Sequence, residues 1–371
     1  MVALVACHGA ATETSGSDAA VDSAIDAGPD AAFVRGKCDA PLTTIGDPSA
    51  PHGIFALEFP QKVEKAVPDV VLNNPAVCGG NVFIVWSYVD AGPNAVQQYD
   101  FSSIDTQIAE WTGAGRSVNL IVWAMSDGAT NYATPPYVVD QITTVSCATS
   151  NLVPVFWKEP YPTLYKAFMA EVLARYATNP AIGYIRFGLS QGGETFPVCK
   201  TTLNGQGFTT PIWESYLADM VAYQTTQTTA KQLMLGINSY GTPPDLSVPD
   251  YEAGLAVANH FGFGSQGLQA SDIASYDQGQ PCGVDWCGNF NTYVGQAPLQ
   301  LQLARPSVPD GTGTGSLVDL LPFALARHAQ ILELFESDLE VAYDPANADY
   351  AQYGAGYRTA IEAAADVLGG R

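Results

Sequence analysis

Positive charge is scarce in this sequence, and its scarcity excludes several classes of partner. The 371 residues carry 15 Lys and Arg against 37 Asp and Glu, which gives a formal net charge of −22 at pH 7. The few basic residues form no cluster along the chain. Nucleic acid is therefore not expected as a partner, because proteins bind it by neutralising phosphates with Lys and Arg. The same argument disfavours an anionic lipid surface.

Long apolar runs and common cofactor motifs are also missing. Beyond the N-terminus no segment has the roughly 18 consecutive apolar residues that a membrane-spanning helix requires. The four histidines are far apart, and the seven cysteines include no Cys-x-x-Cys pair. The chain has no Gly-x-Ser-x-Gly, His-Glu-x-x-His, Walker or Gly-x-Gly-x-x-Gly motif, so esterase, zinc protease and nucleotide-binding functions are disfavoured. We expect no metal and no cofactor.

The N-terminal residues are typical of an exported protein. The run Leu4-Val5-Ala6-Cys7 resembles the lipobox of bacterial lipoproteins, in which the cysteine is acylated after cleavage. Residues 1–7 are therefore interpreted as a truncated signal ending in Cys7, although a chance match is the alternative. Residues 8–36 are rich in Ala, Asp and Ser and predict a disordered tether. We expect a protein that is lipid-anchored at the bacterial cell envelope through Cys7, or secreted.

The remaining cysteines agree with export. Without Cys7 they number six, an even count that allows up to three disulfides in an oxidising compartment. Cys282 and Cys287 enclose a short loop and form the pair that the spacing favours. The connectivity of the other four is left open, since six cysteines allow 15 arrangements.

From residue 37 to 371 the pattern predicts one α/β domain. Short apolar runs alternate with helix-like stretches, which is typical of a (β/α)8 barrel or a doubly wound sheet. A count of eight strands favours the closed (β/α)8 TIM barrel. The predicted strands are Gly53–Phe59, Asn81–Tyr88, Val118–Met125, Ile182–Ser190, Gln232–Ser239, Asn259–Gln266, Pro298–Ala304 and Ile331–Phe335.

Residue parity along each strand predicts which side chains face the barrel interior. We assume that the more apolar side of each strand faces the helices, so the opposite side faces inward. Polar inward residues near the carboxyl ends of the strands are where barrel enzymes carry out their chemistry. The predicted inward residues are Ile54, Ala56, Glu58, Trp86, Tyr88, Trp123, Tyr184, Arg186, Gly188, Ser190, Asn238, His260, Gln266, Gln300, Gln302 and Glu333.

Three stretches resemble the large retaining clan of barrel glycoside hydrolases (clan A), such as barrel β-galactosidases and cellulases. Residues 85–90 and 98–105 resemble the run at the second strand and following helix of that family. Residues 153–184 resemble its helix before strand four, and 186–195 lead to Glu194, where the family places its acid/base glutamate. The resemblance covers most of residues 38–371 and implies a glycoside hydrolase. Two departures stand out: Gly193 replaces the usual Asn, and strand seven offers Gln302 where the family has its nucleophile.

Glycoside hydrolysis needs two carboxyl groups on either side of the scissile bond. Glu194 is the candidate acid/base, because it follows a Gly-Gly step at a strand end; a helix-cap or loop ion-pair role is the alternative. Glu333 is the candidate nucleophile, since an inward carboxylate in an apolar strand is costly unless it is paired or used. The alternative for Glu333 is an ion pair with Arg186. Glu58 is the substitute for the second carboxyl.

Aromatic and polar residues near the strand ends predict a carbohydrate substrate. Sugars stack their C–H faces on aromatic rings and bind polar groups through their hydroxyls. The acidic composition favours a neutral β-glycan over a polyanion. The predicted substrate-binding residues are Glu58, Trp86, Trp123, Trp157, Arg186, Asn238, His260, Trp286 and Gln302.

The sequence therefore predicts a monomeric hydrolase of a β-linked poly- or oligosaccharide. A non-catalytic surface glycan-binding protein on a degenerate barrel is the alternative, motivated by the glutamines of strand seven. A structural or adhesive surface domain is a third possibility, and it would lack an aromatic-lined cleft at the carboxyl ends of the strands.

Overall fold

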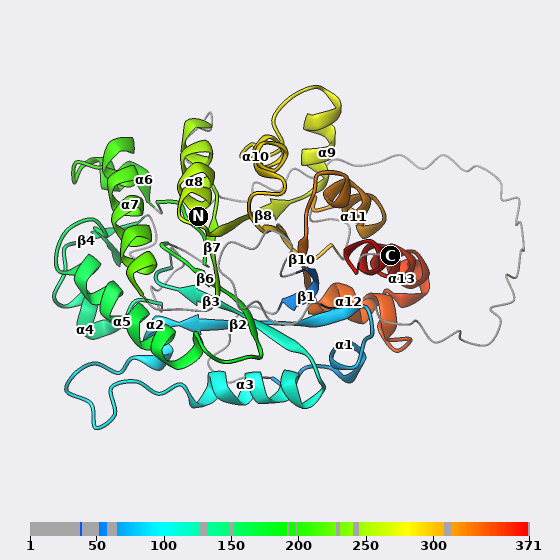
Figure 1. The fold of residues 1–371 in the computed structure, drawn as a ribbon, viewed down its shortest axis with the longest axis horizontal. Coiled ribbons are helices and arrows are strands. Elements are labelled where there is room, and N and C mark those ends of the chain that lie inside the picture. The colour runs from blue at the N-terminus through cyan, green and yellow to red at the C-terminus, as the bar shows by residue number, and fades with distance from the viewer. Residues whose placement is uncertain are drawn as a thin grey trace, which may run out of the picture.

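The chain folds into a closed parallel β-barrel surrounded by helices (Figure 1). The computed structural model describes residues 38, 52–57, 65–126, 133–147, 152–190, 193–197, 199–227, 231–239, 245–307 and 313–369. The barrel order is β1-β10-β9-β8-β7-β6-β3-β2, and each pair of neighbours is parallel. The predicted (β/α)8 barrel is confirmed. The predicted signal and tether, and Glu58, lie outside the described residues.

Each of the eight barrel strands overlaps a predicted strand. They are β1 (Gly53–Leu57), β2 (Val77–Val85), β3 (Ser117–Trp123), β6 (Ile182–Phe187), β7 (Gln232–Gly236), β8 (Gly262–Leu268), β9 (Leu299–Leu303) and β10 (Ile331–Phe335). A separate antiparallel hairpin, β4 (Thr144–Ser146) and β5 (Leu152–Pro154), lies between β3 and the next barrel helix. Apolar and β-branched residues dominate most of the barrel strands, as expected for strands that are covered on both sides.

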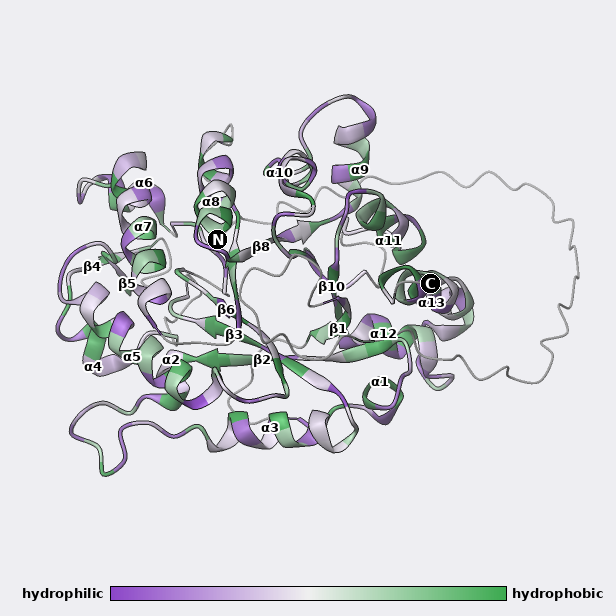
Figure 2. Cartoon of the chain, viewed as in Figure 1, coloured by the Kyte–Doolittle hydropathy of each residue, from purple (hydrophilic) through white to green (hydrophobic). Residues whose placement is uncertain are grey.

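The helices bury apolar stripes against the outside of the barrel (Figure 2). In α7, Thr209 caps the first turn and Pro211 occupies it, which is the usual chemistry of a helix start. No helix in the described ranges is both long and apolar enough to cross a membrane. The helices are α1 (Asp69–Leu72), α2 (Trp86–Val89), α3 (Ser102–Gly113), α4 (Pro136–Val139), α5 (Tyr161–Tyr176), α6 (Lys200–Asn204), α7 (Thr210–Thr226), α8 (Ser247–Ala258), α9 (Ala270–Asp277), α10 (Trp286–Tyr293), α11 (Leu317–Ala326), α12 (Glu336–Tyr343), the π-helix η2 (Tyr350–Gly354) and α13 (Ala355–Leu368).

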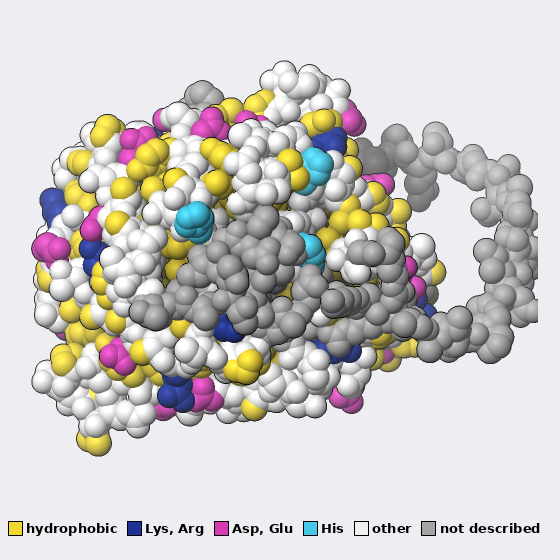
Figure 3. All heavy atoms as spheres, viewed as in Figure 1, with side chains coloured by type: hydrophobic (Ala, Val, Ile, Leu, Met, Phe, Trp, Pro, Cys, Tyr) yellow, Lys and Arg dark blue, Asp and Glu magenta, His cyan; other side chains and the backbone are white. Residues whose placement is uncertain are grey.

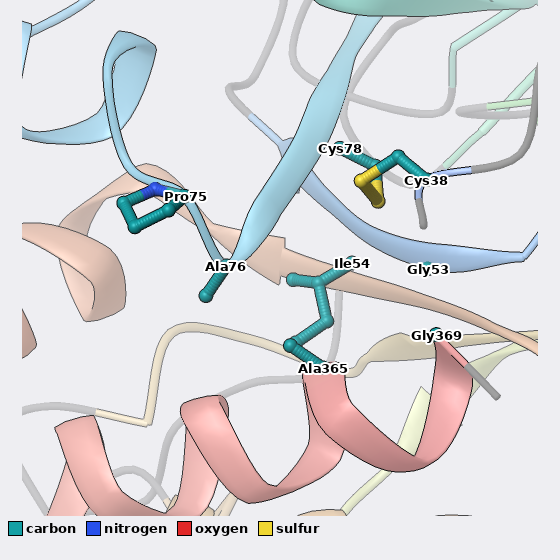
Figure 4. Close-up of a pocket in the computed structure, with 8 residues that line it drawn as sticks. All are labelled: Cys38, Gly53, Ile54, Pro75, Ala76, Cys78, Ala365 and Gly369. Atoms are coloured by element: carbon teal, nitrogen blue, oxygen red, sulfur yellow. A yellow bond between two sulfur atoms is a disulfide. The ribbon is translucent and has the colours of Figure 1, made fainter. Parts of the chain in front are cut away.

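The predicted parity of the first strand is wrong. Phe55 packs with Tyr184 and Met234, which come from strands on other sides of the barrel, so it faces the interior. Ile54 instead points toward Ala365 on α13 (Figure 4). The prediction assumed that the inner face is the less apolar one. This assumption fails at the amino end of the barrel, because the lowest interior layer is itself packed with apolar side chains.

Three disulfides join the six cysteines that lie in the described residues. The predicted Cys282–Cys287 bond is confirmed, and the other pairs are Cys38–Cys78 and Cys147–Cys199. Figure 4 shows the Cys38–Cys78 bond beside Gly53 at the amino end of the barrel. Gly53 has a φ of +124°, and a Cβ there would lie 2.4 Å from the Cys78 sulfur. Only glycine fits this close approach.

Candidate functional site

A buried ion pair crosses the barrel interior. Arg186 on β6 donates from Nη1 to Oε2 of Glu333 on β10 at 3.0 Å, and both side chains are 0% exposed. Arg186 also donates from Nη2 to Oε1 of Gln302 on β9 at 3.1 Å. The inward orientation predicted for these three residues is confirmed. The structure thus gives Glu333 the ion pair that was the alternative to a nucleophile's role.

Tyr184, on β6 nearer the amino end of the barrel, also contacts the buried group formed by Arg186, Glu333 and Gln302. Its hydroxyl donates to Oε1 of Glu333 and lies 3.2 Å from Oδ1 of Asn81 on β2. Burial, and secondarily the negative charge of Glu333, raise the pKa of Tyr184 well above its ordinary value. Each carboxylate oxygen of Glu333 therefore has a donor. Pairing and hydrogen bonding of this kind offset the cost of burying a charged side chain.

Glu194 lies beyond the carboxyl end of β6, the fourth strand of the barrel in chain order. The Gly188 N–H donates to the Val122 carbonyl of β3 at 3.1 Å, and the Ser190 N–H donates to the Glu194 carbonyl at 3.1 Å. Gly193 has a φ of +75°, and a Cβ there would lie 2.3 Å from the Ile121 side chain and 3.5 Å from Nε of Arg186. The loop therefore lies close to the ion pair. Glu194 is half-buried at the carboxyl end of the barrel, which we call the mouth.

Neutral polar side chains surround this position. Gln302 and Gln266 are 9% and 7% exposed, and both face the barrel interior as predicted. A Cβ on Gly236 would lie 3.4 Å from each atom of the Gln266 amide and from the Thr195 N. Within the described part of the chain, neither the Gln266 amide nor the Thr195 hydroxyl has a hydrogen-bond partner. The mouth thus offers hydrogen-bonding groups that could bind hydroxyls.

The second strand contributes less to the mouth than predicted. Trp86 is fully buried outside the barrel, where its ring stacks on Phe168 of α5 at 5.2 Å. Its Nε1 donates to Oδ2 of Asp90 at 2.9 Å, and the Tyr137 hydroxyl donates to the same oxygen at 2.6 Å. The prediction that Trp86 faces inward and binds substrate is wrong. The strand ends at Val85, and the turn of helix that follows rotates the indole toward α5.

Two other predicted binding residues are also misplaced. Trp286 is fully buried between Phe290 and Phe323, so no substrate reaches it. His260 precedes β8 instead of lying within it and belongs to the turn from α8, at the amino end of the barrel. Both predictions treated proximity in sequence to a strand as proximity to the mouth, which holds only at the carboxyl end of a parallel strand.

The remaining predicted aromatics divide between the mouth and the helical layer. Trp123 ends β3 on its inward side, in register with Val85, and packs against Phe83 with ring centroids 5.7 Å apart. Trp157 is half-buried and packs against Phe156 and Phe208 in the helical layer beside α7. Only Trp123 is brought to the carboxyl end of the barrel interior.

Asn238 lies just beyond β7 and is held by a residue that the sequence did not single out. Glu252 on α8 is fully buried; its Oε2 accepts the Asn238 N–H at 2.7 Å and its Oε1 accepts the Trp213 Nε1–H at 3.1 Å. Burial raises the pKa of Glu252 well above its ordinary value. The sequence signal was available, because a lone acid on the apolar face of an otherwise buried helix usually has a specific partner.

A further carboxylate, missed from the sequence, follows the eighth barrel strand. Glu336 begins α12 directly after β10 and is largely buried. The strand runs from Ile331 to Phe335, so Glu336 lies at its carboxyl end, whereas Glu333 lies within it. The position of Glu336 after an apolar strand was the signal for it.

Comparison with known proteins identifies similar folds. No protein-family model and no curated protein sequence matches the chain. Two solved structures share its fold: the β-galactosidase from the psychrophilic Marinomonas ef1, with 10% identity, a TM-score of 0.52 and 86% of this chain covered, and the cold-adapted β-galactosidase from Rahnella sp. R3, with 11%, 0.53 and 89%. The aligned region spans 62% and 57% of those enzymes. The chain thus shares the (β/α)8 barrel fold with these two enzymes.

Proposed function

We propose that this chain is a glycoside hydrolase that cleaves a β-linked poly- or oligosaccharide, with Glu194 as its general acid/base. The observation that carries the proposal is the placement of Glu194. It follows the fourth strand of a (β/α)8 barrel on a loop that packs onto the barrel interior. Catalytic groups of such barrels come from the carboxyl ends of their strands.

The second carboxyl is proposed among three residues. Glu333 is the partner predicted from the sequence, but its negative charge already balances the positive charge of Arg186. A substrate could contact the Glu333 carboxylate only if Arg186 and Gln302 moved aside. Glu336 lies at the mouth end of the same strand. Glu58 follows β1 and lies outside the described residues. A separation of about 5 Å from Glu194 would give a retaining enzyme, and one of about 6.5–9.5 Å an inverting enzyme.

A neutral glycan fits the mouth best. The groups that line it are mainly amides and hydroxyls, and the guanidinium of Arg186 is already neutralised by Glu333. Acidic side chains are spread over the visible face in Figure 3, and the chain has a net charge of −22. An acidic protein repels polyanionic glycans at low ionic strength. We infer that Trp123 and Asn238 are the mouth residues that meet the substrate.

A second candidate function is glycan binding without turnover. One observation favours it: the seventh strand carries Gln302, and the inward carboxylate of the neighbouring strand, Glu333, is paired with Arg186. A site in which Glu194 has no second carboxyl to act with could bind a sugar but could not complete a two-carboxylate mechanism.

Reducing-sugar release from neutral β-glucans, xylans, mannans and galactans tests the two functions. Glu194→Gln should abolish turnover, and the variant of its true partner among Glu333→Gln, Glu336→Gln and Glu58→Gln should do the same. Glu171→Gln, an exposed site on α5, is the matched control and should keep full activity. Affinity for one glycan without turnover on any would support the binding protein instead. Turnover that survives Glu194→Gln would contradict the assignment of the acid.

Export with a lipid anchor at Cys7 is proposed as the cellular setting. The three disulfides support an oxidising compartment. Incorporation of a clickable palmitate analogue into the full chain, and its loss in Cys7→Ser, would support the anchor. Labelling that persists in Cys7→Ser would count against it.

A further inference from the structure

A cavity of about 370 Å³ lies on the outside of the barrel, away from the mouth. Its walls come from the last turn of α7, the start of β7, the end of α8 and the turn into β8. Helices of a (β/α)8 barrel run antiparallel to the strands, so helix carboxyl ends and strand amino ends meet at the amino face. The cavity is thus on the face opposite Glu194. Its lining residues are Gln224, Thr225, Gln227, Leu233, Ala258, Asn259, His260 and Phe261.

The lining is amphipathic and contains no carboxylate, ammonium or guanidinium group. Three amides, one hydroxyl and one imidazole can both donate and accept hydrogen bonds. Leu233 and Phe261 are buried and form an apolar part of the wall. None of the lining residues is Lys, Arg, Asp or Glu. A volume of this size falls within the range of small-molecule clefts, about 300–1,000 Å³.

Gln224 provides an independent sign that a polar molecule is bound here. It is 1% exposed, and among the described residues neither its amide nitrogen nor its amide oxygen has a hydrogen-bond partner. Buried amides are rarely left without partners, because both groups lose their hydrogen bonds to water on burial. A polar ligand that reaches the wall would supply this amide with hydrogen-bond partners.

The neighbouring backbone is held in place for such a site. Gln232 donates from Nε2 to the His260 carbonyl at 3.3 Å, and Asn259 donates from Nδ2 to the Leu255 carbonyl at 2.8 Å. His260 adopts a φ of +60°, a conformation that histidine accepts more readily than most residues. These contacts link α8 to the start of β7 and keep the turn that carries Asn259 and His260 in one arrangement.

We propose that this cavity is a second binding site, for a neutral mono- or disaccharide, on the face opposite the mouth. Hydroxyl groups of a sugar match the amides and the Thr225 hydroxyl, and its C–H face matches the apolar wall. The absence of charged lining residues excludes uronic and amino sugars as the preferred ligands. The site does not depend on the proposed hydrolase activity.

Binding is tested by titrating the full chain with glucose, xylose, mannose, galactose and their β-1,4-linked disaccharides, using calorimetry. Gln224→Leu and Gln227→Ala should each weaken the affinity for the preferred sugar at least tenfold. Gln278→Ala, an exposed site after α9, is the matched control and should bind as the wild type does. Glu194→Gln should also leave this binding unchanged, which separates the site from the mouth.

The stability of the Gln224→Leu variant provides a second test of the proposal. Because the Gln224 amide has no hydrogen-bond partner among the described residues, its replacement by a leucine of similar size should leave the urea midpoint of the sugar-free protein unchanged or higher. A lower midpoint would show that the amide is already satisfied and would remove the sign on which the proposal rests. Binding of no sugar, binding that survives both cavity variants, or binding lost only in Glu194→Gln would overturn it.

Discussion

The ion pair between Arg186 and Glu333 makes a quantitative prediction about stability. Both side chains are 0% exposed and 3.0 Å apart, so removing one leaves the other as an uncompensated buried charge. Such single removals cost about 3–5 kcal/mol, whereas replacing both partners by apolar residues of similar size is often neutral or stabilising. We expect Glu333→Gln and Arg186→Met each to lower the free energy of unfolding by about 3–5 kcal/mol.

Urea unfolding of the wild type, the two single variants and the double variant Arg186→Met with Glu333→Gln provides the measurement. The double variant should lose much less than the sum of the single losses, since neither charge is then left alone. In the double variant the Gln302 amide loses the Arg186 guanidinium, and the Tyr184 hydroxyl loses the Glu333 carboxylate and keeps only Asn81, so full recovery is not expected. Additive losses, or a Glu333→Gln loss below about 1 kcal/mol, would refute the reasoning.

Three further perturbations follow from the structure, each read by urea unfolding. Trp86→Ala should destabilise by about 3–5 kcal/mol, because the indole packs on α5; a loss below about 1 kcal/mol would contradict its burial. Burial raises the pKa of Asp272 to about 6, so the folded state holds the proton more tightly than the unfolded chain does. Its contribution, up to about 3 kcal/mol, is present below pH 4 and lost as the pH rises through 6. Asp272→Asn should flatten the stability curve in this window, and an unchanged slope would assign the titration elsewhere. Gly80→Ala should destabilise, since a Cβ there would lie 2.1 Å from the Trp111 ring; an unchanged midpoint would mean that the ring moves freely.

Much of the fold could be predicted because the signals are local. Alternating apolar runs and helical stretches located all eight barrel strands, and parity placed Tyr184, Arg186 and Glu333 inside. Strand parity is reliable there because these polar side chains of β6 and β10 face one another across the barrel and pair. The Cys282–Cys287 bond was predictable since the two residues are only five apart.

Parity failed where two environments were equally apolar. At β1 both the helical layer and the lowest barrel layer accept large apolar side chains, so the orientation of Phe55 depended on its packing against Tyr184 and Met234. The orientation of Trp86 was predicted wrongly because the strand was expected to continue to Tyr88, whereas β2 ends at Val85. Once a helix begins, all later side chains point in different directions from those that a continued strand would give. Sequence patterns locate such boundaries only to within a few residues.

The sequence by itself determined the architecture: the eight strands, the inward polar residues of β6, β9 and β10, and the acidic composition. Periodicity and charge are properties of neighbouring residues, and they survive without knowledge of distant contacts. Only the tertiary contacts show that Arg186 pairs with Glu333, that Glu252 holds Asn238, and that the Gln224 amide meets no hydrogen-bond partner in the described part of the chain. These outcomes depend on which side chains meet across the barrel or between helices. Closure of the barrel brings together residues far apart in the chain, so their pairing, and with it the second carboxyl at the mouth, lies beyond any local pattern.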